Sequence, residues 1–147
     1  MKKFNTYFKI IVIENSLDDK VKALLEKKFK NVKVIIPKHN LGLAKSYNLG
    51  VQHAKTKFVF LNNPDIDISL KSIKDLLICA KNIKNLGIIS PSYKIDKIYK
   101  NYEINTEKKE YSSKLFKKFG IFEVDLIDNN FLINFDIFKK INFEENY

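Results

Sequence analysis

The sequence predicts an α/β fold with a mostly parallel sheet and helices on both faces. Short apolar runs rich in β-branched residues recur along the first part of the chain, and segments with apolar residues at helical spacing follow them. Strands that alternate with helices at such short spacing form parallel sheets with right-handed crossovers. The 147 residues, 45% of them hydrophobic, suffice for a single domain with a sizeable core.

The first predicted strand covers residues 8–13, a continuous apolar run typical of a strand buried on both faces. An amphipathic helix is predicted over residues 17–30, with Ser16 as its N-cap and acidic residues in its first turn. Four residues form its predicted apolar face: Val21, Leu24, Leu25 and Phe29. The next elements are a strand over 32–36, a helix over 43–54, a strand over 57–61, a helix capped by Ser69 and a strand over 86–89.

The pattern weakens after residue 93. We expect a long irregular insertion over residues 94–118, rich in Lys, Tyr, Asn and Glu, either without regular structure or with a hairpin. Strands are predicted again over 121–127 and 131–134, followed by a short helix over 136–141. No domain boundary is evident, so residues 1–147 are predicted to form one domain.

The charge is +10, and all 27 basic residues are lysines. Proteins that read nucleic acids rely on arginine for bidentate contacts, so we expect no nucleic-acid partner and favour a solvated lysine surface. An anionic membrane face is the alternative partner for this charge. No apolar run reaches the roughly 20 residues of a membrane span. The lone Cys79 fits a reducing compartment, so a cytoplasmic location is expected.

Polar side chains follow the first and third predicted strands. Glu14, Asn15 and Ser16 end the first, and the stretch Asn62-Asn63-Pro64-Asp65 ends the third. In open parallel sheets such strand ends share one edge, where ligands bind. A simple turn would explain one or two of these residues. Asp65 and Asp67 beside Glu14 instead suit Mg²⁺ or Mn²⁺, which bind few carboxylates and complete their shell with substrate phosphates.

The stretch HNLGLAKSYNLG, residues 39–50, opens the second predicted helix. Asn40 and Gly42 fit a helix start, but Asn48 and Gly50 are poor helix formers placed inside it. Residues that break a local rule often mark a functional or closely packed site.

Taken in order, these motifs resemble a family 2 glycosyltransferase of the rhamnosyltransferase-like kind. The resemblance covers residues 8–68 and resumes at DNNFLINFDIFKKINFEENY. It implies the nucleotide-sugar-binding α/β fold called GT-A, and transfer of a sugar from a nucleotide-diphosphate sugar to a glycan or lipid-linked acceptor. It also implies a role in cell-surface polysaccharide synthesis, at the cytoplasmic face of a membrane.

The resemblance also implies roles for individual residues. The nucleotide-sugar pocket would be lined by Glu14, Asn15, Ser16, Asn40, Gly42, Asn48 and Asn63. Asp65, with Asp67 nearby, would hold a Mn²⁺ or Mg²⁺ ion that neutralises the diphosphate leaving group.

Two departures from the family pattern are expected to matter. The family begins one strand and one helix earlier, and its catalytic base follows the segment matched here by residues 142–147. We therefore assign no general base, since Glu144 and Glu145 fall in a different register. An unfilled place beside the first strand would leave an apolar edge, which predicts marginal stability or self-association.

Two other functions remain open from sequence. One is a catalytically inactive remnant or nucleotide-binding module of the same fold. The other is a receiver-like signalling domain, in which Glu14, Asp65 and Ser90 would cluster around a phosphorylated aspartate. The receiver would leave the asparagines and glycines of residues 40–50 unexplained.

Overall fold

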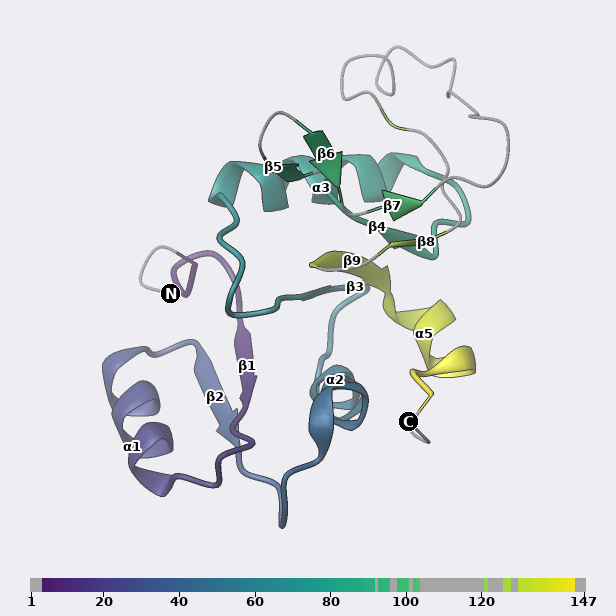
Figure 1. Ribbon diagram of the computed structural model, residues 1–147. Coiled ribbons are helices and arrows are strands. Elements are labelled where there is room, and N and C mark those ends of the chain that lie inside the picture. Colours follow the sequence, from purple (N-terminus) through teal and green to yellow (C-terminus); the bar gives the residue numbers. More distant parts are fainter. Residues whose placement is uncertain are drawn as a thin grey trace. The chain divides into compact units, whose positions relative to one another are not determined.

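A computed structural model describes residues 4–91, 93–95, 98–100, 102–103, 121, 126–127 and 130–144. The chain divides into two compact units. The first comprises Met1–Val59 with Phe135–Tyr147, and the second comprises Phe60–Asn134. The elements of both units are labelled in Figure 1.

The first unit contains a parallel strand pair and three helices. Strand β1 (Ile10–Ile13) pairs with β2 (Val32–Ile35), with Ile10 opposite Val32, and helix α1 (Asp19–Lys28) connects them. Helix α1 packs on β2, and helix α2 (Gly42–Gln52) packs on β1. Helix α5 (Phe135–Ile141) also belongs to this unit. The parallel pair with a helical crossover agrees with the prediction for this part of the chain.

A small apolar cluster holds α1 on the strands. Phe29, Val32 and Val34 are buried, and Ile10, Val12 and Leu25 pack against them. Two details of the helix prediction are wrong. The N-cap is Asp18, whose side chain accepts from the Lys20 N–H, and not Ser16. Leu24 is 63% exposed, because the apolar stripe of α1 that meets β2 is narrower than the spacing suggested.

Strand β1 is half-buried along its length, whereas the sequence predicted burial on both faces. Within the described part of the chain its sheet has the order β1-β2. The side chains of the apolar run 8–13 are therefore only partly buried, because its strand belongs to a sheet in which two strands are described.

The second unit is built on a three-stranded sheet in the order β3-β9-β4. Strand β3 (Phe58–Leu61) belongs to this unit from Phe60 onward. Strand β4 (Ile88–Ile89) lies antiparallel to β9 (Phe131–Asn134). Helix α3 (Leu70–Asn82) packs against β9, and Ser69 caps it by accepting from the Ser72 N–H at 2.9 Å. The late strand β9 thus lies between two earlier ones, and the antiparallel pair makes the sheets mixed.

The core of this unit gathers on one face of α3 and along β9. Leu132 and Ile133 are each 1% exposed. Helix α3 buries Ile73, Leu76, Cys79 and Ala80. Burial of Cys79 confirms that its thiol is a core group.

Four short strands are also described. The strands β5 (Tyr93–Ile95) and β6 (Ile98–Lys100) pair antiparallel, as do β7 (Tyr102–Glu103) and β8 (Leu126–Ile127). They fall partly within the segment 94–118 predicted as an irregular insertion, most of which, residues 104–118, lies outside the described residues.

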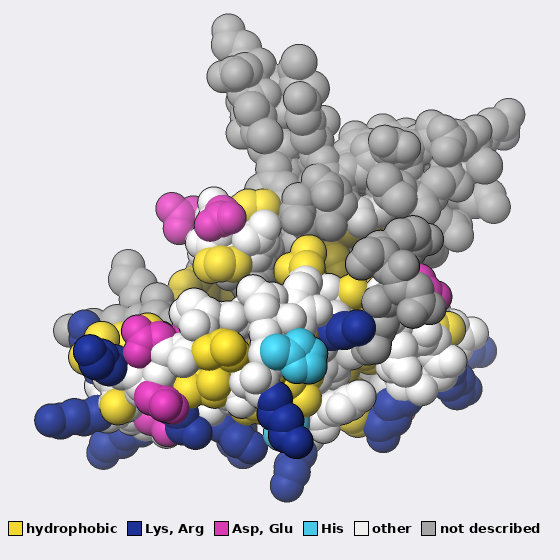
Figure 2. Space-filling model, turned by 60° about the horizontal axis from the view of Figure 1, so that its bottom comes forward, with side chains coloured by type: hydrophobic (Ala, Val, Ile, Leu, Met, Phe, Trp, Pro, Cys, Tyr) yellow, Lys and Arg dark blue, Asp and Glu magenta, His cyan; other side chains and the backbone are white. Residues whose placement is uncertain are grey.

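Lysine side chains are numerous on the face drawn in Figure 2, where they lie among apolar and acidic ones. This mixture is typical of a solvated surface. Among the described helices, none combines the length and the apolar composition that a membrane crossing requires.

Candidate functional site

The predicted site residues fall into two groups, one in each unit. The first group lies where β1 ends and α2 begins. The Glu14 carboxylate accepts from the Ser16 N–H at 2.8 Å and from the Ser16 hydroxyl, which closes a tight turn directly after the strand. The turn leaves Leu17 at a φ of 64°. One Glu14 oxygen is used in this way, and the other accepts no hydrogen bond from the described residues.

Asn15 ties this turn to the start of α2. Its amide oxygen accepts from the Leu41 N–H at 3.2 Å. Its amide nitrogen donates to the Ser46 hydroxyl at 2.7 Å and to the Gly42 carbonyl at 3.3 Å. Both polar atoms of Asn15 are therefore occupied by the protein. Its side chain therefore holds the turn after β1 against the start of α2, although Asn15 and Leu41 are 26 residues apart in the sequence.

The first turn of α2 needs a glycine for its backbone geometry. Gly42 has a φ of +71°, a region that side chains disfavour. Its N–H donates to the Asn40 side chain at 2.8 Å, so Asn40 closes the turn that starts the helix. The Ser46 hydroxyl donates back to the Gly42 carbonyl at 2.5 Å. The N-cap position is held by Leu41, without a side-chain cap bond, so Asn40 orders the turn before the helix and does not cap it as expected.

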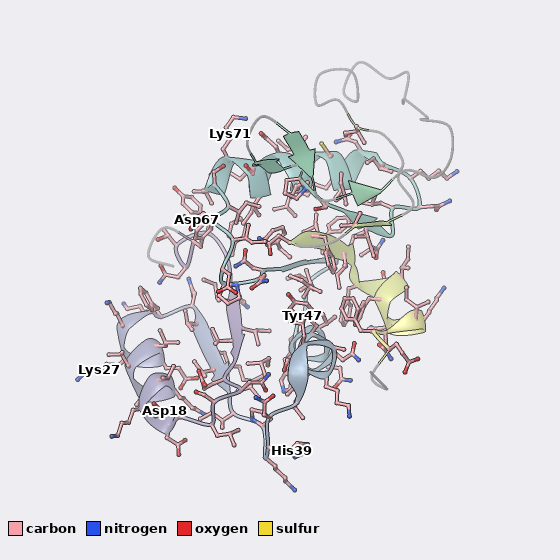
Figure 3. All side chains as sticks on the ribbon, in the orientation of Figure 1. Asp18, Lys27, His39, Tyr47, Asp67 and Lys71 are labelled. Atoms are coloured by element: carbon pink, nitrogen blue, oxygen red, sulfur yellow. The ribbon has the colours of Figure 1, made fainter. Side chains whose placement is uncertain are left out.

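Asn48 is buried, 3% exposed, and Ser46 and Val51 are the other buried residues of α2. Its amide nitrogen donates to the Phe143 carbonyl at 3.0 Å, and its oxygen accepts from the Phe143 N–H at 2.9 Å. The Phe143 ring also contacts Tyr47, whose position on α2 is labelled in Figure 3, and Phe138. Burial raises the pKa of the Tyr47 hydroxyl. Asn48 therefore fastens the segment after α5 onto α2.

The neighbouring Gly50 packs less tightly than its place in the motif suggested. A Cβ built there would lie 3.6 Å from Cγ1 of Ile13, which is an ordinary contact distance.

The second group lies in the turn that follows β3. The Asn63 carbonyl accepts from the Ile66 N–H at 3.2 Å, and the Asn63 side chain accepts from the Asp65 N–H at 3.3 Å. The carboxylates of Asp65 and Asp67 are exposed and accept no hydrogen bond from the described residues. Asp67 is labelled on the connection between β3 and α3 in Figure 3. The turn thus orders its backbone while leaving both carboxylates open to a ligand.

Asn130 completes this second group, and the sequence analysis missed it. Its side-chain oxygen accepts from the Asn63 N–H at 2.5 Å. It lies directly before β9, is 1% exposed and has a φ of 47°. The available signal was the pair Asn129-Asn130 before an apolar strand, since asparagine tolerates positive φ.

The carboxylates of Asp65 and Asp67 could bind a divalent cation as part of an open site, which a substrate would complete. Among the described residues, no three His, Cys, Asp or Glu side chains gather into a closed metal site. Asp65 and Asp67 instead offer exposed carboxylate oxygens on one turn. That set suits Mg²⁺ or Mn²⁺, which keep several waters and take further oxygens from a substrate's phosphates.

Comparison with known proteins identifies one family. The model of the family described as glycosyl transferase family 2 matches residues 3–142. No curated protein and no solved structure matches the chain. The matched stretch contains every predicted site residue in both units.

Proposed function

Because the chain belongs to glycosyl transferase family 2, whose fold is the α/β fold GT-A, we propose that it transfers a sugar from a nucleotide-diphosphate sugar to a glycan or lipid-linked acceptor. The proposal includes a divalent cation, Mn²⁺ or Mg²⁺, at Asp65 and Asp67. It also includes a place in cell-surface polysaccharide synthesis. Membership of the family favours this function over a receiver-like signalling domain.

The turn after β3 is the observation that supports the proposal most. Two exposed carboxylates, at Asp65 and Asp67, follow a strand whose last residue, Leu61, is buried. The backbone between them and the strand is fixed by Asn63 and Asn130. Since no group in the described part of the chain bonds these carboxylates, they can bind a cation without first giving up a partner there. A cation bound there would supply Lewis-acid neutralisation of the diphosphate leaving group.

The residues after β1 receive roles that follow from their contacts. Glu14 retains one carboxylate oxygen for the nucleotide, as the hydroxyls of a ribose would require. Asn15 and Asn48 use their side chains to hold protein segments, so we assign them positioning roles in the nucleotide-sugar pocket. Asn40 and Gly42 shape the loop before α2, and the Ser16 hydroxyl orients Glu14.

A general base remains unassigned. Glu144 is exposed and directly follows Phe143, which Asn48 holds on α2. Glu145 lies outside the described residues. A nucleotide-binding module that transfers nothing is the second function to test, and a transfer assay with a nucleotide sugar and a hydroxyl acceptor separates the two.

Location and association are further parts of the proposal. The excess of lysine suits a cytoplasmic protein that can approach an anionic membrane surface. Exposed Leu24 and Leu43, 63% and 65% accessible, support a tendency to self-associate. Binding to vesicles with and without anionic lipid, and sedimentation over a range of protein concentrations, test these two points.

Thermal-shift titration with UDP and with dTDP, each with and without Mn²⁺, tests the donor site. A ligand that binds only the folded protein at 100 times its Kd stabilises it by about 2.7 kcal/mol. We expect a Mn²⁺-dependent rise in Tm that Asp65→Ala abolishes. The control is Asp19→Ala, which removes an exposed carboxylate at the start of α1. If both variants keep the full shift, the cation is not at Asp65.

A further inference from the structure

Two features of Asn130, its backbone conformation and its buried amide nitrogen, are unfavourable for the stability of the fold. Strand β9, which follows the residue, explains neither of them. The φ of Asn130, 47°, is left-handed, a conformation that asparagine tolerates better than other non-glycine residues but that glycine adopts with less strain. Its side-chain nitrogen is buried and has no hydrogen-bond partner among the described residues. Leaving a buried donor unpaired destabilises the folded protein. Positions that combine strained backbone with an unpaired buried group are often functional.

The contacts of Asn130 join three strand ends of the second unit. Its side-chain oxygen accepts from the Asn63 N–H, beyond the end of β3, at 2.5 Å. Its carbonyl accepts from the Ser90 hydroxyl, directly after β4, at 3.0 Å. Asn130 itself precedes β9, which lies between β3 and β4 in the sheet. Asn130 is therefore held at the ends of β3 and β4, and its bond to Asn63 restrains the turn that bears Asp65.

We infer that Asn130 is a positioning residue for the Asn63–Asp65 turn, holding it in the conformation that presents the Asp65 carboxylate to a metal–diphosphate. This rests on the proposed function, since it assigns the cation and diphosphate to that turn. Pro64 lacks an N–H, so the turn has few backbone donors with which to fix itself. The side chain of Asn63 closes the turn locally, through the Asp65 N–H at 3.3 Å. The bond from Asn130 is the shorter one and anchors the turn to the sheet.

The choice of side chain at position 130 supports this role. Glycine would adopt the same φ with less strain, and it would leave no buried amide nitrogen unpaired. The feature of asparagine that can offset the strained φ and the unpaired amide nitrogen is its amide oxygen, which accepts from the Asn63 N–H. Removing the side chain should therefore loosen the turn and leave the backbone at residue 130 relaxed.

Asn130→Gly tests the inference with a matched control. Asn85 also has a positive φ, 59°, and is exposed, so Asn85→Gly makes the same chemical change away from the turn. The measurement is the Kd of Mn²⁺ in the presence of UDP, by calorimetry, at a temperature where circular dichroism shows each variant folded. We expect about a tenfold weaker Mn²⁺ affinity for Asn130→Gly, as the loss of one well-placed hydrogen bond implies. Asn85→Gly should stay within about twofold of the unaltered chain.

The outcomes separate this inference from the proposed function. If the unaltered chain binds Mn²⁺ with UDP and folded Asn130→Gly binds it equally well, the positioning role is overturned and the metal site stands. If the unaltered chain binds no Mn²⁺ with UDP, the proposed site fails and the inference fails with it. Hydrogen exchange of the Asn63 amide in the unaltered chain covers the case in which Asn130→Gly does not fold. Slow exchange supports the bond to Asn130, and exchange as fast as that of the Asp67 amide overturns it.

Discussion

Asn48 offers the sharpest test of the tertiary structure, because one side chain holds a segment 95 residues away. Asn48→Ala removes two hydrogen bonds to the Phe143 backbone, at 3.0 and 2.9 Å. Each such bond contributes about 1 kcal/mol net. Alanine is the better helix former by up to about 0.7 kcal/mol, which offsets part of the loss. We therefore expect the free energy of unfolding to fall by about 1.3–2 kcal/mol, with more lost if the Phe143 N–H stays buried and unpaired.

Urea denaturation followed by far-ultraviolet circular dichroism measures this change, since a lower midpoint at unchanged slope reports stability directly. Asn82→Ala is the matched control, because Asn82 is an exposed helical asparagine whose side chain donates to the Ile78 carbonyl of its own helix. It should change stability by less than about 0.5 kcal/mol. A loss for Asn48→Ala no larger than that of the control would refute the view that Asn48 fastens the C-terminal segment to α2.

Two further predictions concern Gly50 and Cys79. Gly50→Ala should be neutral or stabilising by up to about 1 kcal/mol, because the new methyl group makes an ordinary 3.6 Å contact with Ile13 and favours the helix. A loss of stability in thermal unfolding would show that the site is closer packed than described. Burial and the nearby Asp75 raise the pKa of the Cys79 thiol. Stability should then fall as pH rises above about 8.5, the ordinary thiol pKa, because the unfolded chain releases the proton first. Cys79→Ala should flatten this slope, and parallel pH profiles for the two proteins would contradict it.

Local patterns in the sequence were enough to predict most elements. The N-cap of α3 was correctly predicted at Ser69, because a cap depends on a residue and its near neighbours. Gly42 was correctly placed at the start of a helix, because a positive φ is a property of one residue and its neighbours. The sequence also determined the α/β class, and its ordered motifs indicated the glycosyltransferase family that the family comparison then identified.

Other features needed the tertiary structure. Leu24 fits the apolar stripe of α1 by spacing and is nevertheless exposed, because the width of the stripe depends on what the helix packs against. The position of β9 between β3 and β4 brings together residues more than 40 apart in the chain, which no local pattern encodes.

The polar residues show the same division between sequence and structure. Their types and their places after strands were visible in the sequence, and these indicated a binding site. Their partners were not, since an asparagine can bind a ligand or hold a backbone with the same two polar atoms. Asn48 bonds Phe143 and Asn130 bonds Asn63, across 95 and 67 residues. Hydrogen bonds over such separations form only when the chain has folded, so the tertiary structure alone decided which side chains hold the protein and which carboxylates remain free.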